Sequence, residues 1–386
     1  MNAAAAKNNP SRKKPLRIAI AAGGTGGHIM PAIALGQTFA DIGEPVELDF
    51  FCGNRPVEKR IYEKNGIHPR IVPVGSIQAG SKVTRLLQYM KLVFSFLRCF
   101  FLMGRYDAVV CMGGYVAAPV VMAGWLRRRP IVLHDSNTVL GRVNRMMAKR
   151  AKAIACGMPL VNYPENIHAA KFIEIGTPVR LFIDKGDRVE AAESMYFQPG
   201  MFTLFIYGGS LGARALNKLM AETLGQLAGI WPPGKGLQVI WATGKENLEE
   251  VRNALRDKPI RGQLWLAPEI ERMDLAYAAS DLIIARSGGS FLAEIMACGK
   301  PAILFPLPSS AENHQYHNAQ VLARHGAALV RDQNETSPSN LAKEIAKLAA
   351  RTDKLQQMSE KCLQMACPDA ARDLARLVIE STKKSK

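Results

Sequence analysis

Three glycine-rich segments carry the clearest chemical signal in this sequence, at residues 22–28, 207–213 and 286–290. Each follows a short apolar run and precedes a pattern of helical spacing, which predicts a strand, a tight loop and a helix. Glycine lets backbone N–H groups approach an anion closely, and the dipole of the following helix favours negative charge there. One such loop is often only a turn, but three in one chain favour phosphate binding.

These loops match neither of the two common nucleotide-binding motifs. A dinucleotide fingerprint counted from Gly24 would need glycine at position 29, which is Ile29. None of the loops continues into the Gly-Lys-Ser/Thr of a P-loop. Because ligands bind at the carboxyl ends of the strands in open α/β sheets, we expect the loops to line a cleft between two facing sheets.

Three polar residues near these loops are candidates for catalysis or binding. His28 stands at the expected start of a helix, where an imidazole has a lowered pKa and suits a neutral general base, although a capping role is the alternative. Asn137, shortly after a predicted strand, offers a donor and an acceptor to a sugar hydroxyl. Glu294, in the helix after the third loop, either accepts hydrogen bonds from ribose hydroxyls or lies on the surface.

No metal site is expected. His314 and His317 share the i, i+3 spacing that metals use, but no third ligand clusters with them and the chain has no Asp-x-Asp pair. The seven cysteines are scattered and lack a Cys-x-x-Cys spacing. They indicate reduced, mostly buried thiols in a cytosolic protein.

Apolar runs alternate with helical patterns along the whole chain, which predicts βαβ units and parallel sheets. In the first half, strands are expected at 16–22, 46–52, 71–74, 108–112 and 131–134. In the second half they are expected at 202–207, 237–243, 263–266, 282–285 and 302–306. Two doubly wound α/β domains of similar size fit this pattern better than one wide sheet.

The junction between the two domains is expected near 176–180, where Thr177-Pro178 breaks regular structure. We divide the chain into a disordered basic tail at 1–15, a first domain at 16–177, a second domain at 178–368 and a terminal helix at 369–386 that returns to the first domain. The tail has no apolar core before a cleavage site, so we do not expect it to be a signal peptide.

The 386 residues carry a formal net charge of +17, with ordinary globular fractions of hydrophobic (48%) and charged (22%) residues. Residues 1–180 hold 25 basic and 10 acidic residues, whereas residues 181–386 hold 25 and 23. Almost all of the excess charge is therefore in the first half. This asymmetry suggests an anionic partner, either nucleic acid or a membrane surface, against the alternative of simple solubility.

The most apolar stretch, 92–103, contains Arg98 and is too short for a bilayer-spanning helix of about 18–20 residues. Extended back to Lys82, it predicts a basic amphipathic helix. Its apolar stripe consists of Val83, Leu86, Leu87, Met90, Phe94 and Leu97. Such a helix either packs in the core of an α/β domain, with this stripe inward, or lies in a membrane interface.

Seven motifs then appear in order: Gly23-Gly-Thr-Gly-Gly-His28, Gly113-Gly-Tyr115, His134-Asp-Ser-Asn137, Gly176-Thr-Pro-Val-Arg180, Gly208-Gly-Ser-Leu-Gly-Ala-Arg-Ala-Leu-Asn217, Arg286-Ser-Gly-Gly-Ser-Phe-Leu-Ala-Glu294 and Gln315-Tyr-His-Asn318. Over about residues 16–380, this set resembles the MurG family of peptidoglycan N-acetylglucosaminyltransferases. The resemblance implies a glycosyltransferase-B fold, in which two Rossmann-like domains face each other across a cleft.

The resemblance also implies an inverting transfer that needs no cofactor. The donor would be UDP-N-acetylglucosamine, and the acceptor would be the 4-hydroxyl of undecaprenyl-diphospho-N-acetylmuramoyl pentapeptide (lipid I), giving lipid II. It implies a peripheral enzyme on the cytoplasmic face of the plasma membrane, at an anionic membrane surface. Proteins of cell-wall synthesis or division are implied as further partners, and nucleic acid is not.

Site residues follow from the matching motifs. The resemblance implies donor or acceptor contacts by Thr25, Gly26, Gly27, Asn137, Arg180, Ser210, Ile270, Gly289, Ser290, Phe291, Leu292, Ala293, Glu294 and Gln315. In particular, it implies that Ile270 meets the uracil through its backbone, that Glu294 binds the ribose and that Asn137 contacts the N-acetylglucosamine. His28 is the residue that we expect to act as the base.

The chain departs from the family at two points. The family often has His-Glu-Gln-Asn where this chain has His134-Asp-Ser-Asn137, and the shorter Asp135 weakens an acid–base role there. A threonine common near the start of the third helix is Phe291 here, so that a phosphate contact is lost or is supplied by Ser290.

Two other functions remain open at this point. A related glycosyltransferase would move a hexose from a UDP-sugar to diacylglycerol, but the first-domain motifs favour the peptidoglycan enzyme. A non-catalytic basic protein would bind nucleic acid or membrane, but the first half has no nucleic-acid motif and no interleaved aromatic residues.

Overall fold

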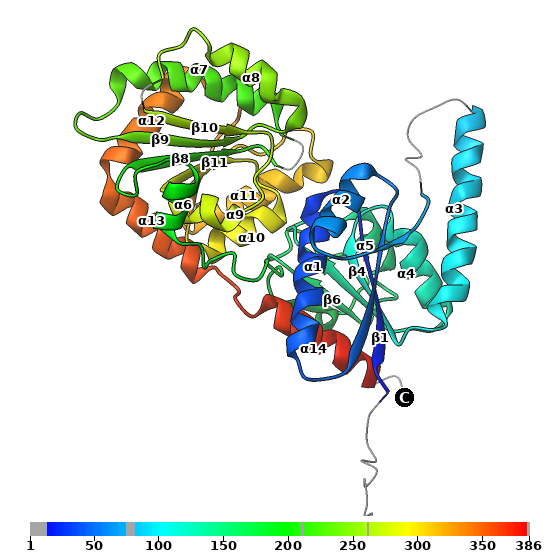
Figure 1. Ribbon diagram of the computed structural model, residues 1–386. Helices are drawn as coiled ribbons and strands as arrows, with labels where there is room; N and C mark the ends of the chain where they lie inside the picture. The colour runs from blue at the N-terminus through cyan, green and yellow to red at the C-terminus, as the bar shows by residue number, and fades with distance from the viewer. Residues whose placement is uncertain (1–13, 75–81, 210–211, 261, 384–386) are drawn as a thin grey trace, which may run out of the picture.

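The computed structural model (Figure 1) describes residues 14–74, 82–209, 212–260 and 262–383. The expected tail at 1–15 therefore lies outside the described residues except for its last two positions. Two parallel sheets, each with helices on both faces, stand side by side as two halves of the molecule. The α/β fold class expected from the alternating pattern is confirmed.

The first sheet has seven strands in the order β3-β2-β1-β4-β5-β6-β7. Its strands are β1 (Leu16–Ala22), β2 (Val46–Cys52), β3 (Arg70–Ile71), β4 (Ala108–Gly113), β5 (Ile131–Asp135), β6 (Ala153–Cys156) and β7 (Phe172–Glu174). The helices around it are α1 (Gly26–Asp41), α2 (Pro56–Lys64), α3 (Lys82–Met103), α4 (Ala117–Leu126), α5 (Arg142–Met147) and the 3-10 turn η1 (Ala169–Lys171).

The second sheet has six strands in the order β10-β9-β8-β11-β12-β13. Its strands are β8 (Phe202–Tyr207), β9 (Leu237–Ala242), β10 (Gln263–Ala267), β11 (Leu282–Ala285), β12 (Ala302–Leu304) and β13 (Ala328–Val330). Its helices are α6 (Arg188–Ser194), α7 (Arg214–Ile230), α8 (Leu248–Leu255), α9 (Met273–Ala279), α10 (Gly289–Ala297), α11 (His314–Arg324), α12 (Pro338–Ala350) and α13 (Thr352–Gln364), with the 3-10 turns η2 (Lys245–Asn247) and η3 (Ala311–Asn313).

The central strands are mostly apolar because helices cover both faces of each sheet. In β4 and β9 every residue is buried. In both sheets the strand order reverses beside the first strand, β1 or β8, so that the loops after the neighbouring strands diverge and leave room for a ligand. The glycine loops follow β1, β8 and β11, at these two positions.

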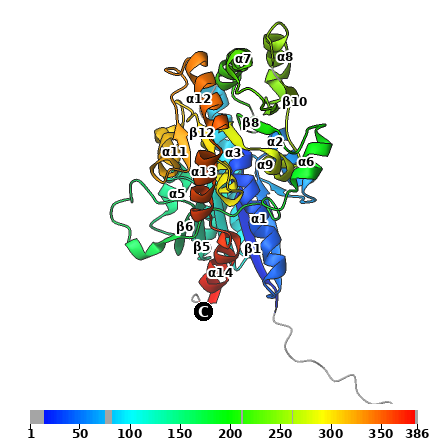
Figure 2. The ribbon, with the colours of Figure 1, turned by 90° about the vertical axis from the view of Figure 1, so that its left-hand side faces the viewer.

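The last helix, α14 (Ala370–Lys383), packs against the first half of the molecule. It contacts α1 and the strands β4, β5 and β6, and its Leu374 and Val378 join the core on that face of the first sheet. Figures 1 and 2 show it beneath the first sheet, reached by a crossing from α13. The two crossings between the halves touch, because a Cβ on Gly176 would clash with Cys367.

The part of the α3 apolar stripe that the structure describes, Met90, Phe94 and Leu97, faces solvent, which corrects the core-facing direction expected for it. Phe94 is 63% exposed and Phe101 is 75% exposed, whereas Cys99 and Met103 face the core. The side chains of 82–89 lie outside the described residues. Figure 1 shows α3 on the outer edge of the first half, away from the second. Within the described residues, no helix is long and apolar enough to cross a membrane.

Candidate active site

A cavity of about 930 Å³ lies between the two halves, where the loops after β1, β5, β8, β10 and β11 face each other. The predicted site residues in its lining are Thr25, Gly26, Gly27, His28, Asn137, Arg180, Ile270, Gly289, Ser290, Phe291, Glu294 and Gln315. Ser210 lies outside the described residues. Leu292 and Ala293 are not in the lining, because both are buried in the core beneath the first turn of α10.

Two helix N-termini meet at this cavity, one from each half. Helix α1 begins at Gly26 after the extended Thr25, and α10 begins at Gly289. A Cβ on Gly27 would lie 4.0 Å from the hydroxyl of Ser290, so the two ends face each other directly. Their unpaired N–H groups and the positive ends of both dipoles make this part of the cavity a binding place for an anion.

Glu58, on α2, fixes the first glycine loop through a hydrogen bond to the backbone of that loop. The side chain is fully buried, and its Oε1 accepts a hydrogen bond of 2.6 Å from the backbone N–H of Gly24. The same carboxylate fits against Gly53, where a Cβ would clash with it. The sequence carried no signal for this residue, because its partner lies 34 positions away in a different loop.

The imidazole of His28 lies against Gly113, whose missing side chain leaves the space that the ring fills. A Cβ on Gly113 would be 2.7 Å from Nδ1 of His28. Burial lowers the pKa of His28, against the opposing influence of the Asp135 carboxylate and a hydrogen bond to the Met112 backbone carbonyl. Because a ring N–H bonds to that carbonyl, the neutral ring keeps its other nitrogen as a proton acceptor in the cavity wall.

The segment after β5 is held by Asp135, which is almost fully buried. One oxygen accepts from the N–H and the Nδ2 of Asn137, and the other accepts from the N–H of Gly141 and the Nδ2 of Asn144. The neighbouring His134 is fully buried, and burial lowers its pKa to about 4. Asp135 therefore supports the position of Asn137, which lines the cavity, whereas Nε2 of His134 lies 3.2 Å from the carbonyl oxygen of Gly176.

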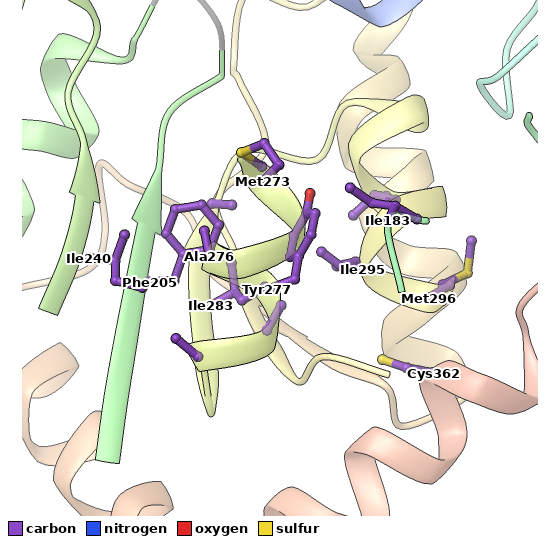
Figure 3. Close-up of a cluster of buried hydrophobic side chains, with 14 of the residues drawn as sticks. Ile183, Phe205, Ile240, Met273, Ala276, Tyr277, Ile283, Ile295, Met296 and Cys362 are labelled. Carbon is purple, nitrogen blue, oxygen red and sulfur yellow. The ribbon is translucent and has the colours of Figure 1, made fainter. Parts of the chain in front are cut away.

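Glu294 lies at the centre of a buried polar cluster in the second half. Arg180 donates to both of its oxygens, from Nε and Nη2, at 2.8 Å each, and the hydroxyl of Tyr277 donates at 2.8 Å. Burial alone would lower the pKa of Arg180, but the paired carboxylate outweighs it and holds that pKa above the usual value. Figure 3 shows Tyr277 standing among apolar side chains of α9, α10 and β11.

The loop after β10, which contains Ile270, is tied across the cavity to the first half. Nζ of Lys64, at the end of α2, lies 3.0 Å from Oε1 of Glu269 and 2.5 Å from Oε1 of Glu271. A second ion pair between the halves joins Arg145 to Glu312. Both ion pairs are largely exposed to solvent and link the first half to the second.

Aromatic rings form part of the wall near the second helix end. Phe291 and Tyr207 both line the cavity, and their ring centroids are 4.9 Å apart. The position where the family often has threonine is thus occupied by a ring that packs on the wall. Ser290, the next residue towards the start of α10, also lines the cavity.

Arg286 is a second cationic side chain in the wall, and it is 8% exposed. Its guanidinium donates to the backbone oxygens of Phe305 and Pro306 and to Oε1 of Gln333, and its Nε has no hydrogen-bond partner. All of these partners are neutral, and burial lowers its pKa to about 10. With a pKa of about 10, Arg286 is protonated at neutral pH, and it lines the cavity.

Gln315 connects two loops of the second half. Its Oε1 accepts from the N–H of Ser287 and of Leu307, at 3.3 and 3.0 Å. The described residues contain no group of three or more histidines, cysteines or carboxylates that could hold a metal ion. His314, one of the two histidines at metal-like spacing, bonds through Nδ1 to the backbone oxygen of Ala311, at 2.8 Å.

Comparison with known proteins agrees with this geometry. Models of the glycosyltransferase family 28 N-terminal and C-terminal domains match residues 18–156 and 203–374. A relative from Myxococcus xanthus (strain DK1622), named UDP-N-acetylglucosamine–N-acetylmuramyl-(pentapeptide) pyrophosphoryl-undecaprenol N-acetylglucosamine transferase, is 32% identical over 370 residues, 95% of this chain and 93% of the relative. A relative of the same name from Desulfitobacterium hafniense (strain Y51) is 32% identical over 385 residues, 96% of this chain and all of the relative.

Solved structures support the same assignment. The crystal structure of Acinetobacter baumannii MurG has a TM-score of 0.72 and 28% identity, and the match covers 95% of this chain and all of that one. A UDP-GlcNAc 2-epimerase from Neisseria meningitidis, bound to UDP-GlcNAc, has a TM-score of 0.64 over 96% of this chain and all of that one, but at 12% identity it shares the fold alone. The glycosyltransferase-B fold class is thereby confirmed. The chain belongs to glycosyltransferase family 28 and, within it, to the family of N-acetylglucosamine transferases that these relatives represent.

Proposed function

We propose that this protein transfers N-acetylglucosamine from UDP-N-acetylglucosamine to the 4-hydroxyl of undecaprenyl-diphospho-N-acetylmuramoyl pentapeptide, with inversion at the anomeric carbon. The observation that carries the proposal is the meeting of two helix N-termini, α1 and α10, beside the imidazole of His28 in one cavity. In this cavity the two helix ends would bind the anionic donor, and His28 would supply the neutral base. The names of the relatives supply the two substrates.

In the proposed reaction, the acceptor oxygen attacks the anomeric carbon from the face opposite to UDP. His28 takes the proton of that hydroxyl, and the bond from the anomeric carbon to the phosphate oxygen breaks with its electrons leaving on UDP. The ends of α1 and α10 and the Arg286 guanidinium stabilise the charge of the leaving diphosphate. Preorganised dipoles and charges of this kind are usually the largest contribution to such catalysis.

The donor nucleotide is proposed to lie in the second half. Glu294 retains lone pairs beyond its three bonds to Arg180 and Tyr277 and would accept from the ribose hydroxyls. The backbone of Ile270 would meet the uracil. Arg180 then acts on the nucleotide chiefly through Glu294, because two of its nitrogens already bond to that carboxylate. The first half, with α14 packed on it, would bind the acceptor.

A transfer assay tests the proposed function. The purified protein is incubated with UDP-[¹⁴C]N-acetylglucosamine and either the undecaprenyl acceptor or diacylglycerol, and the radiolabelled lipid is separated by chromatography. Product with the undecaprenyl acceptor alone is the expected result. Product with diacylglycerol alone would replace this function with the glycolipid alternative, and a failure to bind UDP-N-acetylglucosamine would refute both.

We further propose that the outer face of the first half rests on an anionic membrane, on the cytoplasmic side. The exposed apolar side chains there are Met90, Val93, Phe94, Leu97 and Phe101 of α3 and Met122, Trp125 and Leu126 of α4. Exposed basic side chains accompany them, among them Lys91, Arg98 and Arg128. An acceptor with a lipid tail resides in a membrane, and an exposed face with apolar and basic side chains is suited to lie in the membrane interface.

Charge removal from this face is expected to weaken vesicle binding. Each basic residue near an anionic surface is worth about 1 kcal/mol, so the variant Lys91→Gln/Arg98→Gln/Arg128→Gln should lose about 100-fold in partition to phosphatidylglycerol-containing vesicles at low salt. Arg127 and Arg129 are left in place because the first stacks on Phe100 and the second bonds to the Gly104 carbonyl. Sedimentation with vesicles measures the effect.

The matched control is Tyr196→Ser, which removes an 87% exposed aromatic side chain from the second half. It should bind vesicles as the parent does. Equal binding of the triple variant and the parent, or insensitivity of parent binding to high salt, would contradict an electrostatic membrane contact at this face.

A further inference from the structure

Asn318, on α11, bridges the two halves of the molecule from a position outside the cavity lining. The side chain is fully buried. Its Oδ1 accepts from the N–H and the hydroxyl of Thr138, at 2.9 and 3.0 Å. Its Nδ2 donates to Oδ1 of Asn137, at 2.9 Å, and to the carbonyl oxygen of Ser287, at 3.1 Å. Two donors and two lone pairs are all that an amide has, so this amide is saturated.

The direction of the Asn318 amide is fixed by backbone groups that cannot change roles. The N–H of Thr138 can only donate, so it requires the oxygen, and the carbonyl of Ser287 can only accept, so it requires the nitrogen. The two backbone groups belong to different halves, in the loops after β5 and β11. Both residues are buried. If the Asn318 amide were turned by 180°, its nitrogen would face the N–H of Thr138 and its oxygen would face the carbonyl of Ser287, and two buried groups would lose their hydrogen bonds.

The fixed amide of Asn318 sets the direction of its neighbour. Nδ2 of Asn318 requires an oxygen, so Oδ1 of Asn137 points to it, and Nδ2 of Asn137 then points to Oδ1 of Asp135, at 3.1 Å. One N–H and one lone pair of the Asn137 amide remain for another partner. Asn137 lines the cavity, so that partner is whatever occupies the cavity there.

The loops after β5 and β11 are in such close contact that the hydrogen bonds of Asn318 depend on the relative position of the two halves. A Cβ on Gly289, at the start of α10, would clash with the carbonyl oxygen of Ser136 and lie 3.0 Å from Oδ1 of Asn137. Thr138 and Ser287 are fully buried, like Asn318. Separation of the halves would therefore break the bonds to Asn137 and Thr138 while leaving the bond to Ser287.

We propose that Asn318 is a positioning residue for the sugar of the donor, acting through Asn137. It sets which way the Asn137 amide faces, and it does so only when the two halves are closed on each other. The sugar ring, with its hydroxyl and acetamido groups, then meets a correctly directed donor and acceptor only in the closed molecule, whereas the nucleoside portion of the donor is held by the second half alone. This inference rests on the proposed transfer of N-acetylglucosamine.

The test is the variant Asn318→Asp, which keeps the shape of the side chain but puts an oxygen where Nδ2 faced two other oxygens. Asn137 must then turn or move. With UDP-N-acetylglucosamine and the undecaprenyl acceptor, kcat/KM for the donor is expected to fall about 10- to 100-fold, whereas the Ki of UDP as a competing inhibitor changes less than about 2-fold.

Two further variants make this result interpretable. Gln238→Glu is the matched control. Gln238 is also a buried, hydrogen-bonded amide, but it lies at the amino-terminal end of β9, whereas the cavity lies at the carboxyl ends of the strands. Gln238→Glu should leave the ratio of kcat/KM for the donor to the Ki of UDP unchanged. Thr138→Val removes a single donor to Asn318. It should lower kcat/KM for the donor about 2- to 5-fold while the Ki of UDP stays nearly unchanged. This variant provides the test if Asn318→Asp does not fold.

Parallel loss of donor turnover and UDP affinity in Asn318→Asp and Thr138→Val would overturn the proposal and leave Asn318 as a structural link. Unchanged kinetics in both variants would also overturn it. A parent protein that binds neither UDP nor UDP-N-acetylglucosamine would instead refute the proposed function itself.

Discussion

The variant His28→Ala is expected to lower kcat by about 10²- to 10⁴-fold, the usual contribution of a general base. The ring fills the space over Gly113, and its hydrogen bond to the Met112 carbonyl leaves the other nitrogen free to take a proton. Because alanine leaves the two helix ends in place, the KM for the donor should change little. Steady-state kinetics at saturating acceptor measure the effect.

The pH profile gives an independent readout for the same residue. A base must be neutral to act, and burial places the pKa of His28 below its ordinary value of 6.5. Activity should therefore hold at neutral pH and fall only as the pH drops below 6.5, and this acid limb should vanish in the residual activity of His28→Ala. The control His168→Ala, which removes a histidine that caps η1 away from the cavity, should keep the limb. A near-normal kcat in His28→Ala would remove His28 from the role.

The variant Glu294→Ala is expected to affect both stability and donor binding. It leaves the Arg180 guanidinium and the Tyr277 hydroxyl without their common partner in a site where Glu294 is 7% exposed. Removal of one member of a buried ion pair costs about 3–5 kcal/mol, so the free energy of unfolding should fall by about that amount in urea titrations. The KM for UDP-N-acetylglucosamine should rise at least about 10-fold as the ribose contact is lost.

Tyr277→Phe is the matched control for this cluster. It removes one hydrogen bond to the carboxylate and keeps the ion pair, so a loss of about 1–3 kcal/mol is expected, with a smaller rise in KM. Calorimetric titration with UDP separates the two effects, because it is carried out on folded protein. An unchanged affinity of folded Glu294→Ala for UDP would refute the ribose contact.

The strands were the most predictable part of this molecule. Mostly apolar runs bounded by glycine, proline or charged residues gave β1, β8 and β11 at their observed bounds, because a strand covered on both faces is apolar at most of its positions. The short strands β6, β7 and β13 were missed. Runs of three or four residues carry too little periodicity to be told from a loop or a helix end, and they become strands only by pairing with the edge of an existing sheet.

Helix α3 shows where periodicity fails for a different reason. Spacing reveals that a helix has an apolar face, but not what that face meets. Phe94 and Leu97 belong to a regular stripe, yet they are exposed, and the core is met by Ser95, Cys99 and Met103 instead. An apolar stripe on the exposed face of a helix has the same residue spacing as a stripe that packs in the core.

The site was predictable where the chemistry is local and unpredictable where it depends on partners. Glycine loops before helices identify the cavity wall, and the family motifs identify His28 and Asn137. Glu58, Tyr277 and Asn318 act through residues 34, 17 and 181 positions away. Nothing in a single sequence relates positions so far apart, because only the folded chain brings them together.

The return of α14 to the first half sets the order in which this protein can be completed on the ribosome. The first sheet ends at Glu174, but α14, which shares one face of that sheet with α1, begins at Ala370, about 195 residues later. At about 5–20 residues per second, the part of that face beside α1 waits roughly 10–40 s for α14 while the second half is synthesised. The second half can fold during this interval, so the last part of the chain to emerge completes the part that emerged first.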